Sequence, residues 1–206
     1  AIIQHDVRRL DRLISDIADA SRLDAELARR DSEAVNVTRL LETIVGLAND
    51  TARPGQPKFV LVVEDSSDAG AFTVMGHDTR LGQVFTNLID NARSFSPAGT
   101  IVTVTARRDD DTVEVVVEDE GPGINADNID RIFERFYTDR PEQAFGKNSG
   151  LGLAISRQIV DAHKGRIWAE NREGRAGPDG TRPILGARFI VRIPLLAADW
   201  APPSRA

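Results

Sequence analysis

Residues 100–120 hold two β-branched runs separated by an acidic turn, and this pair constrains the fold more than any other feature. The runs are "TIVTVTARR" (100–108) and "TVEVVVEDE" (112–120), rich in the valine and threonine that favour extended strands. Only the three aspartates at 109–111 separate them, which indicates a tight turn. The segment therefore predicts a β-hairpin, and with it a sheet whose neighbouring strands run antiparallel.

Further strands and helices alternate on both sides of this hairpin. Apolar runs predict strands at 59–64, 71–76, 166–171 and 187–195. Helical patterns predict helices at 38–50, 79–95, 125–136 and 150–165, with Asp78 as the N-cap of the second. Because most strands pair as neighbours through short connections, we expect an α+β fold. This is a two-layer α/β sandwich, with one mixed, largely antiparallel sheet covered by helices on one face.

The first 28 residues differ from the rest, since they predict one long helix with a single apolar stripe. The stripe recurs at spacings of four and three and consists of Ile3, Val7, Leu10, Ile14 and Ile17. It indicates packing against another helix or, alternatively, against the chain's own domain. The polar segment 28–36 then reads as a linker or domain boundary. The chain starts in mid-pattern without Met, so we expect it to be a fragment of a longer protein.

Composition excludes several classes of function. The net charge of −6 argues against a nucleic-acid-binding protein that neutralises phosphates. There is no cysteine, and the three histidines (His5, His77 and His163) are scattered, which argues against a metal centre built from those residue types. No run of about 18 apolar residues is present, so no membrane-spanning helix is expected.

Two asparagines stand one helical turn apart in "NLIDNARSFSP" (87–97), although asparagine is a poor helix former. Asn87 and Asn91 share one face of the predicted helix. A carboxamide oxygen is a hard, neutral ligand that suits Mg²⁺ bound to nucleotide phosphates. The alternative is that both asparagines lie on a solvated face.

The segment "EDEGPGI" (118–124) follows a strongly β-forming run. A carboxylate at a strand end can accept a hydrogen bond from an exocyclic amine such as that of adenine. Gly121 and Gly123 would let the backbone approach a planar ring. The alternative is a simple Gly-Pro turn, because one G-x-G is weakly specific.

Two more segments complete the set of candidates. In "IFERFY" (132–137) the default interpretation of Phe133 and Phe136 is a core contact beside a solvated charge. In "GKNSGLGLAIS" (146–156), glycines and Ser149 directly before a helix supply backbone N–H groups for an anion. The second segment is neither a P-loop nor a dinucleotide fingerprint, and it could instead be a flexible linker.

The order N-x-x-x-N, D-x-G-x-G, F-x-x-F, G-x-G-L resembles the catalytic and ATP-binding domain of bacterial sensor histidine kinases. The resemblance covers residues 36–195 and implies the sandwich fold shared with topoisomerase and chaperone ATPases. The first helix resembles the second helix of the dimerisation and histidine-phosphotransfer hairpin, and its stretch "RRLDRLISDIADASRLDAELARR" (8–30) looks like that of sensor kinases of the alphaproteobacterial acid-sensing, virulence-linked type. The implied domains are the hairpin helix (1–30), the catalytic and ATP-binding domain (31–198) and a tail (199–206).

The resemblance also implies roles for individual residues. Asn91 would bind Mg²⁺, Asn87 would help to hold the phosphates, and Asp119 would accept the adenine amino group. Residues 125–148 would form an ATP lid latched by the phenylalanine motif. The remaining implied ATP-binding residues are Gly121, Gly123, Ile124, Phe136, Lys147, Ser149, Gly150, Leu151 and Gly152.

The chain departs from the family pattern at two positions where a cation is common. Ser94 stands where the family often has Lys, and Thr138 stands where many members have Arg. Transition-state charge on a transferred phosphoryl group requires a cation. We therefore expect a catalytic cation from among Arg93, Arg135, Arg140 and Lys147.

The implied function is that of a protein-histidine kinase, with ATP and Mg²⁺ as cofactors. His5 reads as a surface residue without the family's acceptor pattern, so no histidine of this chain is expected to be phosphorylated. The implied partners are a second copy, through the hairpin helices, and a response regulator. The implied location is the cytoplasmic portion of an inner-membrane sensor, attached through segments upstream.

Two other functions stay open at this point. The first is an ATP hydrolase of the same fold, but such proteins have Glu at the position of Asn87, where it activates water, and an amide is not basic enough to do so. The second is a non-enzymatic dimerisation module, which would bind no nucleotide.

Overall fold

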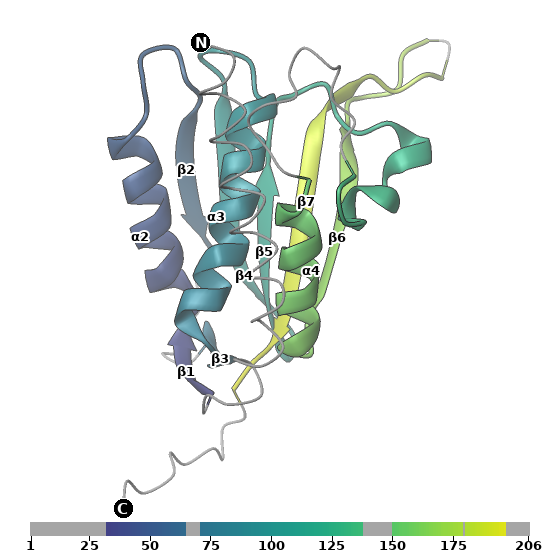
Figure 1. Ribbon diagram of the computed structural model, residues 1–206. Helices are drawn as coiled ribbons and strands as arrows, with labels where there is room; N and C mark the ends of the chain where they lie inside the picture. Colours follow the sequence, from purple (N-terminus) through teal and green to yellow (C-terminus); the bar gives the residue numbers. More distant parts are fainter. Residues whose placement is uncertain (1–31, 65–70, 138–149, 179, 197–206) are drawn as a thin grey trace, which may run out of the picture.

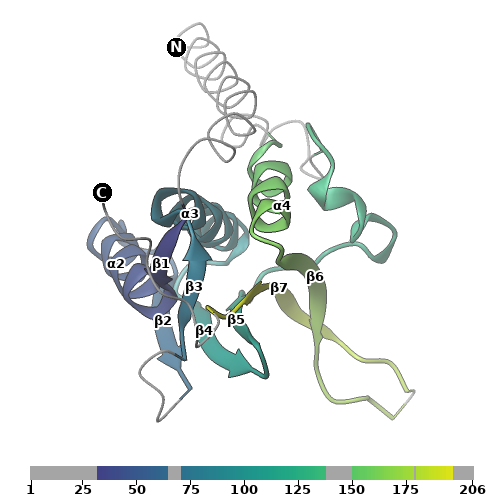
Figure 2. The same cartoon turned by 90° about the horizontal axis from the view of Figure 1, so that it is seen from below.

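The computed structural model describes residues 32–64, 71–137, 150–178 and 180–196, which form two layers. Figures 1 and 2 show helices α2, α3 and α4 together on one face of the main sheet. The helices are α2 (Val37–Asp50), α3 (Asp78–Phe95) and α4 (Gly152–Ala162). The strands of the main sheet are β2 (Lys58–Val63), β4 (Ile101–Asp109), β5 (Thr112–Glu118), β6 (Arg166–Glu173) and β7 (Ile184–Pro194). The expected two-layer α/β sandwich is confirmed.

The main sheet has the strand order β2-β4-β5-β7-β6. Strand β2 runs parallel to β4, and every other neighbouring pair is antiparallel, so the mixed, largely antiparallel sheet is also confirmed. The predicted hairpin is the β4–β5 pair, which closes at Asp109 and Thr112. The last strand, β7, lies inside the sheet between β5 and β6.

A second, two-stranded sheet was not expected. It pairs β1 (Glu33–Asn36) antiparallel with β3 (Thr73–Gly76), so the second half of the supposed linker at 28–36 is a strand. Val35 pairs with Val74, and both are buried. One apolar residue with a tertiary partner is enough to order this polar stretch, because strand formation depends on context more than on composition.

Two local predictions are wrong. The N-cap of α3 is His77, and Asp78 is the first helical residue, whose carboxylate accepts from the Thr79 N–H. The predicted helix at 125–136 is a pair of short 3₁₀ turns, η1 (Ala126–Asn128) and η2 (Arg131–Phe133). The Asn125 side chain accepts from the Asp127 N–H, a local bond that competes with helix propagation. The predicted helix at 1–28, lid residues 138–148 and the tail lie outside the described residues.

The core lies between the three helices and the inner face of the sheet. Helix α3 contributes its buried stripe, and alternate residues of the strands meet it. The largest fully buried side chains include Phe59, Phe85, Leu41, Leu81 and Leu88. Within the described ranges, no helix is long and apolar enough to span a bilayer.

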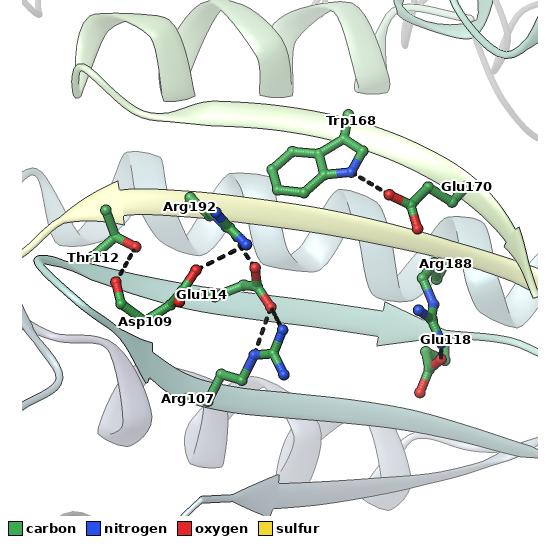
Figure 3. Close-up of polar contacts among 9 residues, drawn as sticks. All are labelled: Arg107, Asp109, Thr112, Glu114, Glu118, Trp168, Glu170, Arg188 and Arg192. Carbon is green, nitrogen blue, oxygen red and sulfur yellow. Dashed lines mark hydrogen bonds and ion pairs between the residues drawn. The ribbon is translucent and has the colours of Figure 1, made fainter.

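The outer face of the sheet carries a ladder of opposite charges (Figure 3). Glu114 is only 2% exposed and accepts from Arg107 at 2.7 Å and from Arg192 at 2.6 Å. Arg192 also contacts Asp109 and lies over the ring of Trp168. A buried carboxylate is tolerated when its charge is paired and hydrogen-bonded. The paired charges therefore explain how a carboxylate is buried on this outer face.

His163 joins the C-terminal end of α4 to the end of β3. Its Nε2 accepts from the His77 backbone N–H at 3.1 Å, so Nδ1 carries the proton and donates to the Ile159 carbonyl at 2.7 Å. Burial lowers the pKa of His163 below its ordinary 6.5, the Ile159 bond raises it, and His77 lowers it further. The folded state therefore prefers the neutral ring.

We predict that the domain loses stability as the pH falls through 6.5, because the unfolded chain then binds a proton that folded His163 resists. Between pH 6.5 and 5.5 this contribution is at most about 1.4 kcal/mol. Urea unfolding at pH 7.5, 6.5 and 5.5 measures the effect. His163→Gln, which keeps a neutral donor and acceptor, should show a smaller pH dependence than the wild type. An identical pH dependence in the two proteins would contradict this assignment.

Candidate functional site

Helices α3 and α4 bring together two sequence motifs that lie 65 residues apart. The Asn87 Nδ2 donates to the Gly152 carbonyl at 3.1 Å and to the Ser156 Oγ at 3.2 Å. Ser156 is fully buried and itself donates to the Gly152 carbonyl at 2.8 Å. The amide nitrogen of Asn87 is thus turned to the start of α4, which leaves its carbonyl oxygen as an acceptor for other groups.

Asn91 lies one turn further along α3 and is half-buried. Within the described part of the chain, its side-chain amide has no hydrogen-bond partner, and its backbone carbonyl accepts from the Ser94 Oγ at 2.8 Å. An unengaged carboxamide oxygen suits a hydrated Mg²⁺ ion that carries phosphates, and Asn91 lies one helical turn from Asn87, which contacts the start of α4. The carboxamide oxygen of Asn91 therefore fits the role of a protein ligand for Mg²⁺.

The start of α4 is held against the end of the phenylalanine motif. Phe136 donates its backbone N–H to the Gly150 carbonyl at 3.0 Å. Gly150 has a φ of +72°, and a Cβ there would lie 2.9 Å from the Tyr137 carbonyl, so only glycine fits. Leu151 is the buried N-cap residue, and the first-turn N–H groups from Gly152 onward have no partner inside the helix. Such a helix start favours an anion.

Asp119 is held at the end of β5 by two backbone donors. Its Oδ1 accepts from the Gly121 N–H at 2.8 Å and from the Ala187 N–H at 3.0 Å. The side chain is 2% exposed, and in the described residues Oδ2 has no partner. The geometry leaves one carboxylate oxygen to accept a hydrogen bond from a ligand.

Burial raises the pKa of Asp119 above its ordinary 3.8, because the ionised form is desolvated. The bonds from Ala187 and Gly121 and the charge of Arg172 act in the opposite direction and are smaller. Above pH 3.8 the ionised carboxylate therefore destabilises the unliganded fold. A ligand that donates to Oδ2 would offset part of this cost.

The Arg93 side chain does not lie with the other candidate residues. Its guanidinium lies 5.1 Å from the centre of the Phe59 ring, donates to the Ala48 carbonyl and pairs with Asp90 at 2.9 Å. It is engaged with α2 and β2, on a different face of α3 from Asn91. The expectation that Arg93 supplies a catalytic cation is therefore not supported by its position.

Arg135 follows η2 and approaches Gln158 of α4 at 3.5 Å, so it lies beside the helix that starts at the candidate site. The other expected cations and one expected ligand, Arg140, Lys147 and Ser149, lie outside the described residues.

The two phenylalanines of the motif have different environments. Phe133 is buried in the core, as expected, and Arg157 lies over its ring at 5.2 Å. Phe136 is 58% exposed with a φ of +65°, so the core interpretation is wrong for this residue. Its backbone is turned to bond Gly150, which directs the side chain outward.

Several residues that contact the site could not be identified from the sequence. Ala187 acts through its backbone N–H, which leaves no side-chain signal. Asn171 and Arg172 contact residues 124 and 119, respectively, from β6, far along the chain. Ser156 lies inside a helix where the pattern predicted only packing. Within the described ranges, no group of three or more His, Cys, Asp or Glu side chains could hold a metal ion.

Comparison with known proteins gives a consistent result. A family model described as "Histidine kinase-, DNA gyrase B-, and HSP90-like ATPase" matches residues 76–197. Sensor protein ChvG of Rhizobium meliloti (strain 1021) is 54% identical over 198 residues, which cover 94% of this chain and 33% of that protein. The chain thus spans about a third of the length of the first curated relatives it matches.

Two solved structures of longer chains have a similar fold. Full-length ShkA in complex with AMPPNP matches with a TM-score of 0.72 and 27% identity, over 92% of this chain and 36% of that chain. Histidine kinase ThkA in complex with response regulator protein TrrA matches with a TM-score of 0.68 and 26% identity, over 95% of this chain and 50% of that chain.

Proposed function

Because the chain belongs to the family of histidine kinase-, DNA gyrase B- and HSP90-like ATPases, we propose that it is the ATP-binding catalytic part of a sensor protein-histidine kinase. In this reaction a histidine nitrogen attacks the γ-phosphorus, the bond from that phosphorus to the β,γ-bridging oxygen breaks, and ADP leaves. A receiver aspartate of a response regulator then takes the phosphoryl group.

The observation that carries the proposal is the side-chain amide of Asn87 and the hydrogen bonds that it makes. Hydrolases of this fold resemble the chain but have a glutamate there, which activates water. Asn87 is an amide, and its nitrogen is committed to Gly152 and Ser156 of α4. Such a group is neither basic nor free to take a proton from water. The γ-phosphate is therefore left for a nucleophile that another element supplies.

The remaining residues bind and position the nucleotide. Asp119 Oδ2 accepts from the adenine amino group, and the α4 start, with Gly150 and Gly152, receives the phosphates. Asn91 is the protein ligand for Mg²⁺, which when bound neutralises phosphate charge. Catalysis then comes from positioning and charge neutralisation. We assign the catalytic cation to the group of Arg135, Arg140 and Lys147.

The acceptor histidine belongs to a dimerisation hairpin. His163 is buried and both its ring nitrogens are hydrogen-bonded, so neither is a free nucleophile. His77 is the N-cap of α3, ten residues or about 15 Å of helix from Asn87. His5 lies outside the described residues. We further propose that the full-length protein is a homodimeric inner-membrane sensor with this domain in the cytoplasm.

The proposal predicts phosphoryl transfer to a histidine supplied separately. With γ-labelled Mg-ATP, the chain alone should acquire no acid-labile label, whereas an added helical hairpin with an acceptor histidine should become labelled. Asn91→Ala should reduce labelling by about 100-fold or more, since its ligand oxygen is lost. The matched control is Asn49→Ala, on α2, which should label the hairpin at the wild-type rate.

Other outcomes separate the alternatives. Release of inorganic phosphate without labelled hairpin would identify a hydrolase. Failure to bind ATP at all would identify a non-enzymatic module. Label on the chain that disappears in His5→Ala would overturn the assignment of the acceptor.

A further inference from the structure

The loop that would face the nucleotide base is fastened by a side chain from a distant strand. Asn171 of β6 accepts from the Ile124 N–H and donates to the Ile124 carbonyl, both at 2.7 Å. The side-chain amide thus bonds to both polar groups of one backbone residue, as a neighbouring strand would. The bonds fix the end of the loop formed by residues 119–124, called the base loop below.

The next residue of β6 fastens the other end of the base loop. Arg172 donates to the Asp119 carbonyl at 2.8 Å, and its guanidinium also lies 3.6 Å from Glu118. Successive residues of a regular strand point to opposite faces. Asn171 and Arg172 nevertheless both bond the base loop, at its two ends, and the β6–β7 register shifts directly after Arg172.

The middle of the base loop is enclosed from the same side. A Cβ placed on Gly123 would lie 2.4 Å from the Ile184 Cγ2 and 2.7 Å from the Asn171 Oδ1. The loop therefore lies against β6 and the start of β7 along most of its length. Six residues with two glycines and a proline would otherwise pay conformational entropy on binding a ring.

We propose that Asn171 is a positioning residue for adenine binding: its two bonds to Ile124 preset the base loop so that the Asp119 carboxylate faces the ring. This inference rests on the proposed function, since it takes the ligand of Asp119 to be adenine. Asn171 acts at the base end of the nucleotide and has no part in phosphate or Mg²⁺ binding. Its contribution is therefore the same for every adenine ligand, whatever the number of phosphates.

The chain contains a matched control for this interaction. Asn49 of α2 makes the same pair of hydrogen bonds with the backbone of Phe59. It donates to the Phe59 carbonyl at 2.9 Å and accepts from the Phe59 N–H at 3.0 Å. Phe59 lies on β2, and β2 and β6 form the two opposite edges of the main sheet. Asn49→Ala therefore removes the same pair of bonds without touching the base loop.

The test compares adenosine, ADP and Mg-ATP affinities of the wild type, Asn171→Ala, Asn171→Ser and Asn49→Ala, with thermal unfolding of each. Asn171→Ala should weaken all three ligands by the same factor, about tenfold for the loss of one to two hydrogen bonds. Asn171→Ser keeps one hydroxyl that bonds either the Ile124 N–H or its carbonyl, so it should weaken them less. Asn49→Ala should lower the melting temperature and leave all three affinities unchanged.

The outcomes distinguish this inference from the proposed function. Wild-type affinities in Asn171→Ala, or a loss confined to Mg-ATP, would overturn the positioning role alone. Wild-type protein that binds none of the three ligands would overturn the proposed function and this inference with it. If Asn171→Ala does not fold, Asn171→Ser decides: equal losses for the three ligands support the role, and unchanged affinities overturn it.

Discussion

Replacing Asp119 with asparagine should weaken ATP binding by about 100-fold or more without destabilising the fold. Asp119 Oδ1 is committed to the Gly121 and Ala187 N–H groups, so the asparagine oxygen must take that place. The amide nitrogen then occupies the position of Oδ2 and presents a donor to the adenine amino group, which is also a donor. The substitution thus replaces an attractive contact by a repulsive one at nearly constant shape. Titration calorimetry with Mg-ATP measures the loss.

The stability of the same variant provides the internal control. Because burial raises the pKa of Asp119, the ionised group opposes folding above pH 3.8, and a neutral amide does not carry this cost. Urea unfolding at pH 7 should therefore give Asp119→Asn a free energy of unfolding equal to or above that of the wild type. Asp161→Asn, an exposed position on α4, removes the same charge and should keep wild-type ATP affinity. Intact ATP binding in a folded Asp119→Asn protein would contradict the site.

Replacing Gly186 with alanine should destabilise the domain by about 3 kcal/mol or more. Gly186 has a φ of +149°, and an added Cβ would lie 1.9 Å from the Asp119 carbonyl oxygen. That atom belongs to the backbone and cannot move aside without breaking the bond from the Asp119 N–H to the Ala187 carbonyl. The variant should therefore unfold at lower urea concentration and bind ATP less well. Equilibrium unfolding with an unchanged m-value measures the difference.

A glycine elsewhere in the chain shows how specific this effect is. Gly46 lies within α2, and a Cβ there meets nothing within 4 Å. Gly46→Ala should stabilise the domain by about 0.5 to 1 kcal/mol, the usual gain in a helix interior. If Gly186→Ala and Gly46→Ala unfold at the same urea midpoint, the close backbone approach at Gly186 does not cause the predicted loss of stability.

The main elements of the fold could be predicted because their signals are local. The β4–β5 hairpin follows from valine-rich runs around three aspartates, and α3 and α4 follow from apolar periodicity. Strand β1 could not be predicted, since it depends on pairing with β3 about 40 residues later. The 3₁₀ turns at 126–133 were mistaken for a helix because the two conformations share the same short-range pattern.

The candidate site was predictable where a motif contains its own chemistry. Asp119, Asn87 and Gly152 stand out by residue type, and the structure brings the last two into contact. The direction of Arg93 was not predictable, because Ala48 of α2 and Phe59 of β2, which Arg93 contacts, are distant in sequence. The pair of hydrogen bonds between Asn171 and Ile124 has no local sequence signature either.

The position of β7 has a consequence for how the protein is made. Strand β7 is the last strand of the described chain, yet it fills the gap between β5 and β6 and supplies the Ala187 N–H that holds Asp119. A nascent chain leaves the ribosome from its N-terminus, so the sheet is split until residues 184–194 emerge. The candidate site therefore cannot form during synthesis of the earlier segments. Nucleotide binding would follow the synthesis of β7, and a chain cut before β7 would expose its core and bind no ligand.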